Sequence, residues 1–215
     1  MLALYGHPFS SYTWKALIPL YACDIPFDFR MVDPDHPANC EVVAGAGPLR
    51  KFPVLADGDA LIFEATTIVE HLARHHAAAG LLPEDPDAAI EMRMLDRVFD
   101  NYVMNTMQDV VTEYLRPESD RDLRRVEAVC ERLSRTYAWL EGWLENYARP
   151  ARVTLIECAA APSLFYADWV HPIGDEFPRL KQWRAHLLAL PPVKRCVDEA
   201  RPWRPHFPLG ALDRD

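Results

Sequence analysis

The spacing of apolar residues changes once along this chain, and the change restricts the fold to two unlike parts. In the first part, short strand-like stretches alternate with helix-like ones: Phe27, Phe29 and Met31 recur every second residue, as in a half-buried strand. In the second part the apolar residues recur at helical spacing, for more than four turns between Val126 and Leu144. The pattern therefore predicts a mixed α/β domain followed by an all-α bundle.

The composition of residues 81–88 marks the connection between the two parts. This stretch, "LLPEDPDA", combines two prolines with three acidic residues, which is typical of an exposed link. Before it, Asp57-Gly58 favours a tight hairpin turn between two apolar runs, which should be antiparallel neighbours. We expect the order β-α-β-(α)-β-β-α in residues 1–78, a linker over 79–88 and helices throughout 89–215.

The charge of the chain argues against two classes of partner. Its 23 basic and 32 acidic residues give a formal net charge of -9, which would repel nucleic acid and anionic membrane surfaces. No apolar run approaches the roughly 18 residues that a membrane-spanning helix needs, and no secretory leader is recognisable. We therefore expect a cytoplasmic protein whose partners are small molecules or other proteins.

The cysteines and histidines predict no metal site. The cysteines are scattered, form no Cys-x-x-Cys pair and are odd in number, which suits reduced thiols. His71 and His75 lie four residues apart on one predicted helix face, but without a third ligand nearby we expect solvated side chains. The five cysteines are Cys23, Cys40, Cys130, Cys158 and Cys196.

One helix start in the second part can be assigned from the sequence. Thr154 and Glu157 are three residues apart and form a capping box, in which each side chain binds the backbone amide of the other residue. The small side chains that follow allow close helix packing. We expect this helix to be the central and most buried one of the bundle.

Three stretches together resemble a known family. They are "LYGHPFSSYTWKALIPLY" (4–21), "RKFPVLADGDALIFEATTIVEHL" (50–72) and "VTLIECAAAPSLFYADWVHP" (153–172). These resemble the cytosolic glutathione transferase (GST) superfamily, of the bacterial type with a serine start motif, and the resemblance covers essentially the whole chain. It implies a thioredoxin-like N-terminal domain, an all-α C-terminal domain, glutathione as co-substrate and a homodimer.

The resemblance implies that a serine at the first helix start activates the glutathione thiol. An ordinary thiol has a pKa of about 8.5, and a helix N-terminus with a hydroxyl can stabilise the thiolate. Ser10 corresponds to the family's catalytic serine, with Ser11 as the alternative, and one of the two can instead cap the helix. The motif is also similar to that of the zeta class, whose members isomerise maleylacetoacetate, although Tyr12 replaces a cysteine and Lys15 an arginine of that class.

The glutathione-binding positions of the family also have counterparts here. In the family, the proline matching Pro53 follows a cis peptide bond and its neighbour, here Phe52, presents backbone groups to the cysteinyl part of glutathione. An acidic residue orients the glutathione amine, and the amides at the next helix start hold the γ-glutamyl carboxylate. By this resemblance the binding residues are Lys51, Phe52, Pro53, Glu64, Ala65 and Thr66.

Ala65 departs from the family's pattern, because most members have a serine at this position. A hydrogen bond to a charged group is worth about 1.5 to 3 kcal/mol, so its loss should weaken glutathione binding on the order of tenfold or more. The Thr66 side chain could replace the missing hydroxyl only if the backbone shifted. This leaves open a non-catalytic binding module on the same fold, with low or lost activity.

The resemblance places the electrophile pocket on the first helix of the bundle. Tyr102, Asn105 and Asp109 are the candidates for it, although core packing is the favoured interpretation of Tyr102, which continues an apolar stripe. Asp100 would reach across the homodimer to the glutathione of the other subunit. Together these features predict a detoxifying glutathione transferase that acts on a small apolar electrophile, with zeta-like isomerisation as an alternative.

Overall fold

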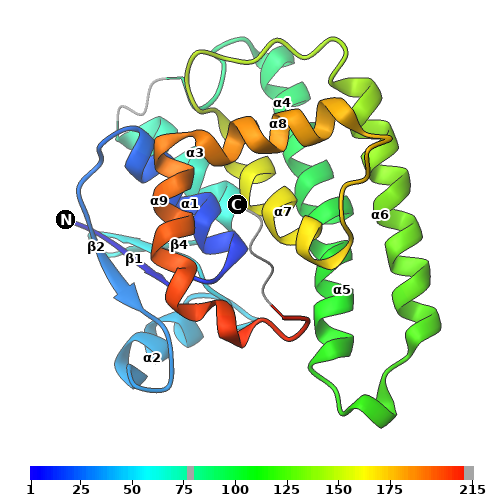
Figure 1. The fold of residues 1–215 in the computed structure, drawn as a ribbon. Helices are drawn as coiled ribbons and strands as arrows, with labels where there is room; N and C mark the ends of the chain where they lie inside the picture. Colours follow the sequence, from blue (N-terminus) through cyan, green and yellow to red (C-terminus); the bar gives the residue numbers. More distant parts are fainter. Residues whose placement is uncertain (77–79, 211–215) are drawn as a thin grey trace.

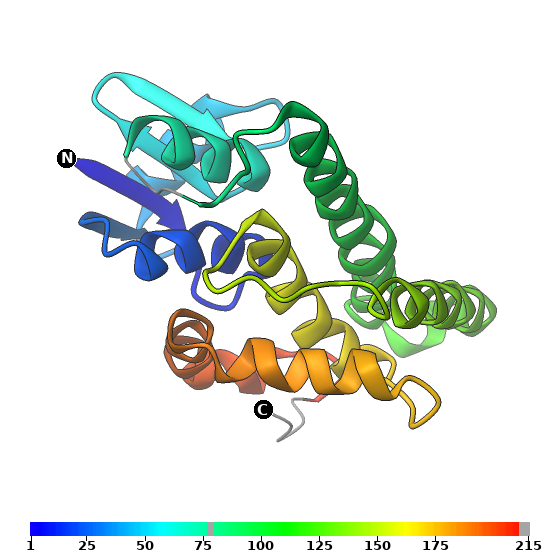
Figure 2. The same ribbon diagram turned by 90° about the horizontal axis from the view of Figure 1, so that it is seen from above.

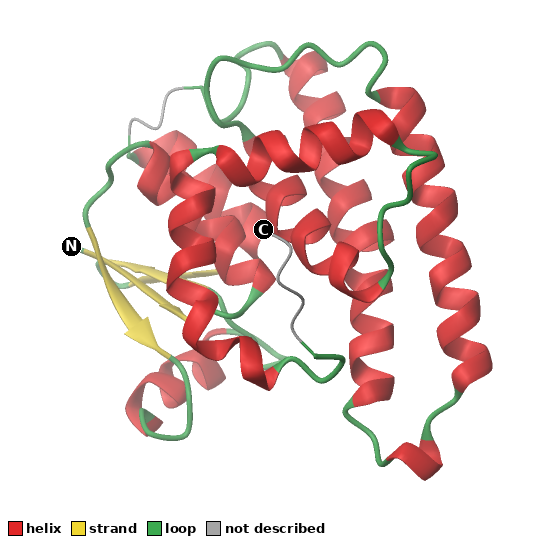
Figure 3. Ribbon diagram, in the orientation of Figure 1, coloured by secondary structure: helices red, strands yellow, loops and turns green. Residues whose placement is uncertain are grey.

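The computed structural model describes residues 1–76 and 80–210, which form a small sheet domain joined to a larger group of helices (Figures 1 and 3). This confirms the expected fold class, a thioredoxin-like α/β domain followed by an all-α domain. The domain boundary expected at residue 78 lies outside the described residues. The first helix after it, α4 (Pro86–Val98), begins with Asp85 as its N-cap.

The N-terminal domain is built on one mixed four-stranded sheet in the order β2-β1-β3-β4. The two pairings of β1 differ in direction, since β1 is parallel to β2 and antiparallel to β3. Strands β3 and β4 form an antiparallel hairpin, as predicted. Gly58 at the hairpin turn has a φ of 58°, which glycine adopts without a steric penalty. The strands are β1 (Leu2–Gly6), β2 (Phe27–Met31), β3 (Val54–Asp57) and β4 (Ala60–Phe63).

Three helices accompany this sheet: α1 (Ser11–Ala22), α2 (Pro37–Ala46) and α3 (Ala65–His75). The apolar face of α3 is fully buried because Ile68, Val69 and Leu72 recur at helical spacing. Helix α1 packs against α3 and against the helical domain, and it is therefore buried along most of its length.

A long rod of helix runs beside the sheet domain and forms one side of the candidate site (Figure 2). It consists of α4, a π-helical segment η1 (Phe99–Met104) and α5 (Asn105–Tyr114), which follow one another without a gap. A π-helical turn closes its hydrogen bonds one residue later than an α-helical turn and so rotates the residues that follow.

Helix α7 (Leu155–Val170) is the central helix, as predicted. It lies between α1 and the α4–α5 rod (Figure 2), and all its residues except the last are buried. The predicted capping box is present: the Thr154 amide donates to the Glu157 carboxylate at 2.9 Å. The remaining helices are α6 (Leu123–Trp143), α8 (Pro178–Ala189), α9 (Pro191–Ala200) and the short 3₁₀ segments η2 (Glu118–Asp120) and η3 (Arg201–His206). Among the described residues, none of the helices has the length and apolarity needed to cross a membrane.

Candidate functional site

A cavity of about 250 Å³ lies where the sheet domain meets the α4–α5 rod. The loop before β3 and the start of α3 form one wall, and the rod forms the other. Five of the six residues predicted to bind glutathione line this cavity: Lys51, Phe52, Pro53, Glu64 and Ala65. The rod and α1 contribute Arg97, Asp100, Asn101, Asn105 and Tyr12.

The loop wall has the backbone geometry that the resemblance implied. The Phe52–Pro53 peptide bond is cis, and β3 begins directly after it at Val54. Pro53 is buried, whereas Lys51 is exposed at the rim of the cavity. The backbone of Phe52 is thus held next to the cavity by the strand that follows it.

The start of α3 forms the second part of this wall. Glu64 is the N-cap residue, with φ 68° and ψ 118°, and its side chain makes no capping hydrogen bond. The first amides of a helix have no partner within the helix, and together with the helix dipole they favour a bound carboxylate. The start of α3 therefore offers an anion-binding surface to the cavity, with the buried Ala65 as its first helical residue.

Behind this helix start lies a buried cluster of charges centred on Lys15. The Lys15 ammonium, whose side chain is 1% exposed, lies 2.5 Å from Asp96 Oδ1 and 2.7 Å from Asp100 Oδ1. It also donates to the Thr66 hydroxyl at 2.9 Å, and that hydroxyl donates to Asp96 Oδ2 at 2.9 Å. Both hydrogen-bonding roles of the Thr66 hydroxyl are thus used inside the cluster, and Thr66 does not line the cavity.

Two residues of the rod connect this cluster to the cavity. Arg97 contacts Thr66 and Asp96 and lies 2.9 Å from Asp100 Oδ2. Burial raises the pKa of Asp100, although the nearby Lys15 ammonium opposes the shift. The carboxylate predicted to cross the dimer is therefore held by Lys15 and Arg97 of its own chain.

Tyr12 is a site residue to which the sequence assigned no role. Its hydroxyl donates to Asn105 Oδ1 at 2.9 Å, and burial raises its pKa well above the ordinary value, so it stays protonated. The only sequence signal was its position two residues after Ser10, where the zeta class has a cysteine. Tyr12 fixes α1 to the rod at the edge of the cavity.

A second cavity of about 320 Å³ adjoins the first and shares Tyr12 and Phe52 with it. Ser10 and Ser11 line this second cavity. Ser10 is the N-cap of α1, and its hydroxyl oxygen accepts from the Thr13 amide at 3.3 Å, whereas Ser11 is the first helical residue. The other lining residues are mostly apolar: Phe9, Met107, Gln108, Val111, Leu115, Tyr166, His206, Phe207 and Pro208.

The residues predicted for the electrophile pocket do not come together. Asn105 lines the first cavity, while Asp109 forms an ion pair with Arg132 at 2.9 Å and lines neither cavity. Tyr102 is 59% exposed and faces a separate groove with Met94 and Trp139, so the expectation that it packs in the core was wrong.

The π-helical segment explains the error at Tyr102. With α-helical spacing the apolar stripe predicts that Tyr102 is buried, but the wider turn of η1 moves the buried face to Val103 and Met104. The same shift directs Met107, Gln108 and Val111 of α5 to the second cavity. A single sequence without a recognisable π-helix signal does not reveal this change of face.

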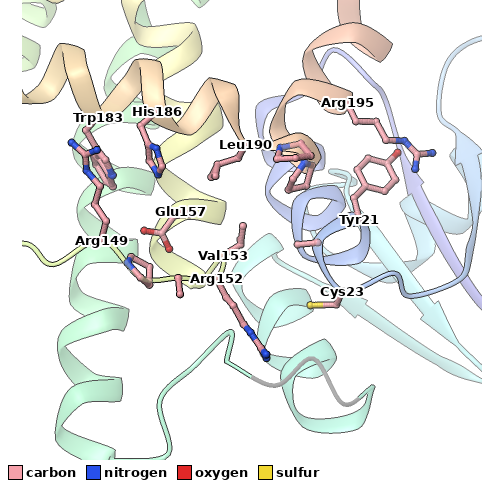
Figure 4. Close-up of a pocket in the computed structure, with 15 residues that line it drawn as sticks. Tyr21, Cys23, Arg149, Arg152, Val153, Glu157, Trp183, His186, Leu190 and Arg195 are labelled. Carbon is pink, nitrogen blue, oxygen red and sulfur yellow. The ribbon is translucent and has the colours of Figure 1, made fainter.

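A larger cavity, about 720 Å³, lies elsewhere between the end of α1, the loop before α7 and the α8–α9 corner (Figure 4). None of the predicted site residues lines it. Its arginines do not converge on one point: Arg149 lies toward Trp183, Arg152 points away from it, and Arg195 stacks on Tyr21 at 3.8 Å and binds Glu199. We therefore place the functional site in the two adjoining cavities.

Comparison of the sequence with known proteins finds similarity to glutathione transferases. Residues 4–80 match the sequence profile described as "Glutathione S-transferase, N-terminal domain". Glutathione S-transferase F6 of Arabidopsis thaliana is 24% identical, over 91% of this chain and 99% of the relative. A probable maleylacetoacetate isomerase of Vibrio cholerae is also 24% identical, over 94% of this chain and 97% of its own length.

The solved structures give the same result for the fold. A glutathione S-transferase from Methylobacillus flagellatus KT, solved with GSH bound, superposes with a TM-score of 0.79 at 25% identity. The alignment covers 91% of this chain and 98% of that one. The similarity thus extends through both domains.

Proposed function

We propose that this chain, which matches a glutathione S-transferase N-terminal profile over residues 4–80, is a member of the glutathione transferase superfamily. In this proposal it is an enzyme that binds glutathione, ionises its thiol and delivers the thiolate to a small apolar electrophile. The observation that carries the proposal is the first cavity, in one wall of which the cis-proline loop and the uncapped start of α3 lie together.

In this proposal the γ-glutamyl carboxylate binds at the start of α3. The amides of Ala65 and Thr66 donate to it, and the exposed Glu64 side chain orients the glutathione amine. The backbone of Phe52 aligns the cysteinyl part, and the exposed Lys51 side chain pairs with the glycyl carboxylate. Because Thr66 is held by Lys15 and Asp96, its hydroxyl does not take over the role of the missing serine.

The thiol then lies at the junction of the two cavities, in front of α1. A thiolate there is stabilised by the helix dipole and by hydroxyl donors. Ser10 caps the helix through a lone pair of its oxygen, which leaves its O–H free to donate to sulfur. Capping and thiolate stabilisation are therefore compatible at Ser10, and Ser11 is the second donor in reach of the same cavity.

The second cavity supplies the binding place of the electrophile. Its lining is mostly apolar, and it adjoins the expected position of the sulfur. In the reaction, the thiol gives its proton to solvent, and the thiolate attacks an electron-poor carbon of the electrophile and forms a thioether. That carbon releases its leaving group as an anion, or, where it belongs to an activated double bond, the π-bond breaks and the neighbouring carbon takes a proton from water. The electrophile that we propose is accordingly small and largely apolar.

We further propose a homodimer in the cytoplasm, with the domains divided at 1–78, 79–88 and 89–215. Two separate sets of large apolar side chains are exposed on the single chain, and such surfaces favour association. One set lies on the sheet domain (Leu49, Leu61 and Phe63) and the other lies along α4, η1 and α6 (Ile90, Met94, Tyr102 and Trp139). Sedimentation should give twice the chain mass of 24.6 kDa; the single-chain mass at micromolar concentration would contradict the dimer.

The enzyme proposal is tested by following the loss of free thiol when the protein is mixed with glutathione and a panel of small electrophiles. We expect turnover with at least one electrophile, and a lower kcat in Ser10→Ala than in the control variant Ser119→Ala, which lies far along the chain on an exposed segment. If no electrophile reacts above the uncatalysed rate although glutathione binds, the chain is a binding module and the enzyme proposal fails.

Isomerisation is a second candidate because a maleylacetoacetate isomerase is among the relatives. The serine pair that begins the zeta motif is present, but Tyr12 stands in place of its cysteine. An isomerase would convert an unsaturated diketo acid while the concentration of glutathione stays constant. A conjugating enzyme would consume one glutathione per product, so the thiol assay separates the two.

A further inference from the structure

Asp57, His71 and His76 meet at the end of the sheet domain that lies away from the glutathione cavity. Asp57 is the last residue of β3, His71 lies on α3, and His76 is the residue that ends α3. The same oxygen, Asp57 Oδ2, lies 3.0 Å from His71 Nε2 and 2.9 Å from His76 Nε2. One ligand atom from each of the three residues lies within 4.8 Å of the other two.

From this geometry we propose that Asp57, His71 and His76 bind one Zn²⁺ ion, with a water molecule as the fourth ligand. Two imidazoles and a carboxylate are a donor set that zinc prefers, whereas magnesium and calcium prefer oxygen ligands. The three side chains are 18% to 30% exposed, so the ion and its water can reach them from solvent.

The two distances from Asp57 Oδ2 to the histidine nitrogens are close to those that a zinc ion requires. Zinc binds imidazole nitrogen and carboxylate oxygen at about 2.0 to 2.2 Å, which separates neighbouring ligand atoms of a tetrahedral site by roughly 3.3 Å. The observed separations of 2.9 and 3.0 Å need to open only by a few tenths of an ångström. Rotation of side chains on fixed backbone elements supplies such a change.

The third ligand explains why the sequence predicted no metal here. That expectation considered His71 with His75, which is four residues away on the same helix. In the structure the His75 ring lies with its centroid 4.6 Å from that of the His71 ring, tilted by 38°, and does not join the group of ligand atoms. The fold instead brings in Asp57, from the strand 14 residues earlier, and His76 at the helix end.

The ion would act on the stability of the sheet domain and not on the thiol. Helix α3 has 11 residues, so at 1.5 Å per residue its two ends are about 16 Å apart. Ala65 at the first end lines the glutathione cavity, whereas His71 lies about one turn before the other end and His76 directly follows that end. A bound ion would tie the β3–β4 turn to the last turn of α3 and stabilise the folded state by linkage.

The proposal is tested on the full chain, free of any histidine tag and treated with a chelator. Co²⁺ is titrated in, its visible absorption is recorded, and Zn²⁺ is then used to displace it. We expect one ion per chain with the intense absorption of a tetrahedral site. Asp57→Asn, which keeps the size and polarity of the side chain, and His71→Ala should each weaken the affinity at least about tenfold.

His75→Ala is the matched control, because it removes the neighbouring imidazole from the same helix without touching the three ligands. Its affinity for Zn²⁺ should equal that of the unmodified protein, and circular dichroism and glutathione titration should show that every variant is folded. No stoichiometric binding would overturn the proposal and leave a hydrogen-bonded His–Asp–His cluster. The same conclusion follows if His75→Ala weakens binding as much as His71→Ala does.

Discussion

Two helix starts face the adjoining cavities, and they are built differently. At the start of α1, Ser10 has an extended backbone conformation and its hydroxyl accepts from the Thr13 amide, as in an ordinary N-cap. At the start of α3, Glu64 has a positive φ of 68° and provides no side-chain cap. A non-glycine residue rarely adopts such a conformation, and where one does it commonly lies at a functional site.

The difference shows which helix start is complete without a ligand. Helix α1 satisfies one of its free amides with its own serine, whereas Glu64 does not cap α3 with its side chain. The first amides of α3 are thus suited to a bound group, for which a carboxylate is the best match. Lys15 of α1 links the two, because it binds Thr66 of α3 and the carboxylates of the rod. The open helix start is therefore held in place by a buried cluster of charges behind it.

The largest effect is expected from removing that support. Lys15→Met leaves Asp96 and Asp100 buried without their ammonium partner, and breaking a buried ion pair in this way costs about 3 to 5 kcal/mol. The free energy of unfolding, measured by urea denaturation, should fall by that amount. Lys181→Met, which breaks an exposed ion pair with Asp175, is the control and should change little. Equal effects of the two substitutions would show that the cluster does not support the fold.

The next effect concerns the open helix start itself. Ala65→Ser adds a hydroxyl that can donate to the bound carboxylate, so glutathione affinity should rise on the order of tenfold or more, or about 1.5 to 3 kcal/mol. Calorimetry with reduced glutathione measures the change. Ala88→Ser, an exposed position on α4, is the matched control and should bind as the unmodified protein does. Unchanged affinity in Ala65→Ser would refute the role given to the start of α3.

A smaller effect separates capping from catalysis at the start of α1. Ser10→Ala removes the cap and should lower the free energy of unfolding by about 1 kcal/mol, while Ser10→Gly should lower it by only a few tenths. Both remove the hydroxyl, so both should lose thiolate stabilisation equally if Ser10 donates to sulfur. If Ser10→Gly is nearly as active as the unmodified protein and Ser10→Ala is less active, kcat changes in parallel with the free energy of unfolding. That result would mean that Ser10 only caps the helix.

The smallest effect is a pH dependence carried by Asp100. Burial raises its pKa above that of the unfolded chain, so the folded state holds the proton more tightly. This stabilisation is complete below the ordinary carboxylate pKa and is lost as the pH rises through the raised value. The unmodified protein should therefore lose stability as the pH rises through this interval, whereas Asp100→Asn, which cannot titrate, should not. The free energy of unfolding of the variant minus that of the unmodified protein should increase accordingly.

Urea denaturation at a series of pH values from about 4 upward measures the pH dependence at Asp100. Asp175→Asn is the opposite control, because Lys181 lowers the pKa of Asp175 and the corresponding difference should decrease with pH. A flat difference for Asp100→Asn would show that its carboxyl is not destabilised by burial.

The parts of the molecule that depend on local pattern could be predicted from the sequence. The hairpin at Gly58, the capping box of α7 and the two-part fold follow from turn chemistry and apolar spacing within short windows. The cluster around Lys15 could not be predicted, because Asp96 and Asp100 are more than 80 residues away and charged residues usually lie at the surface. The exposure of Tyr102 could not be predicted, because Tyr102 lies on the π-helical segment η1, whose wider turn rotates the buried face of the rod.

The central claim is that the open start of α3 and the cis-proline loop together bind glutathione. Calorimetric titration of the purified protein with reduced glutathione at pH 7 tests it most directly. The account predicts saturable one-to-one binding, even at a Kd of about 1 mM, which corresponds to roughly -4.1 kcal/mol. No heat and no change in tryptophan fluorescence up to about 10 mM, well above that Kd, would contradict the claim and make the chain a GST-fold module with another partner.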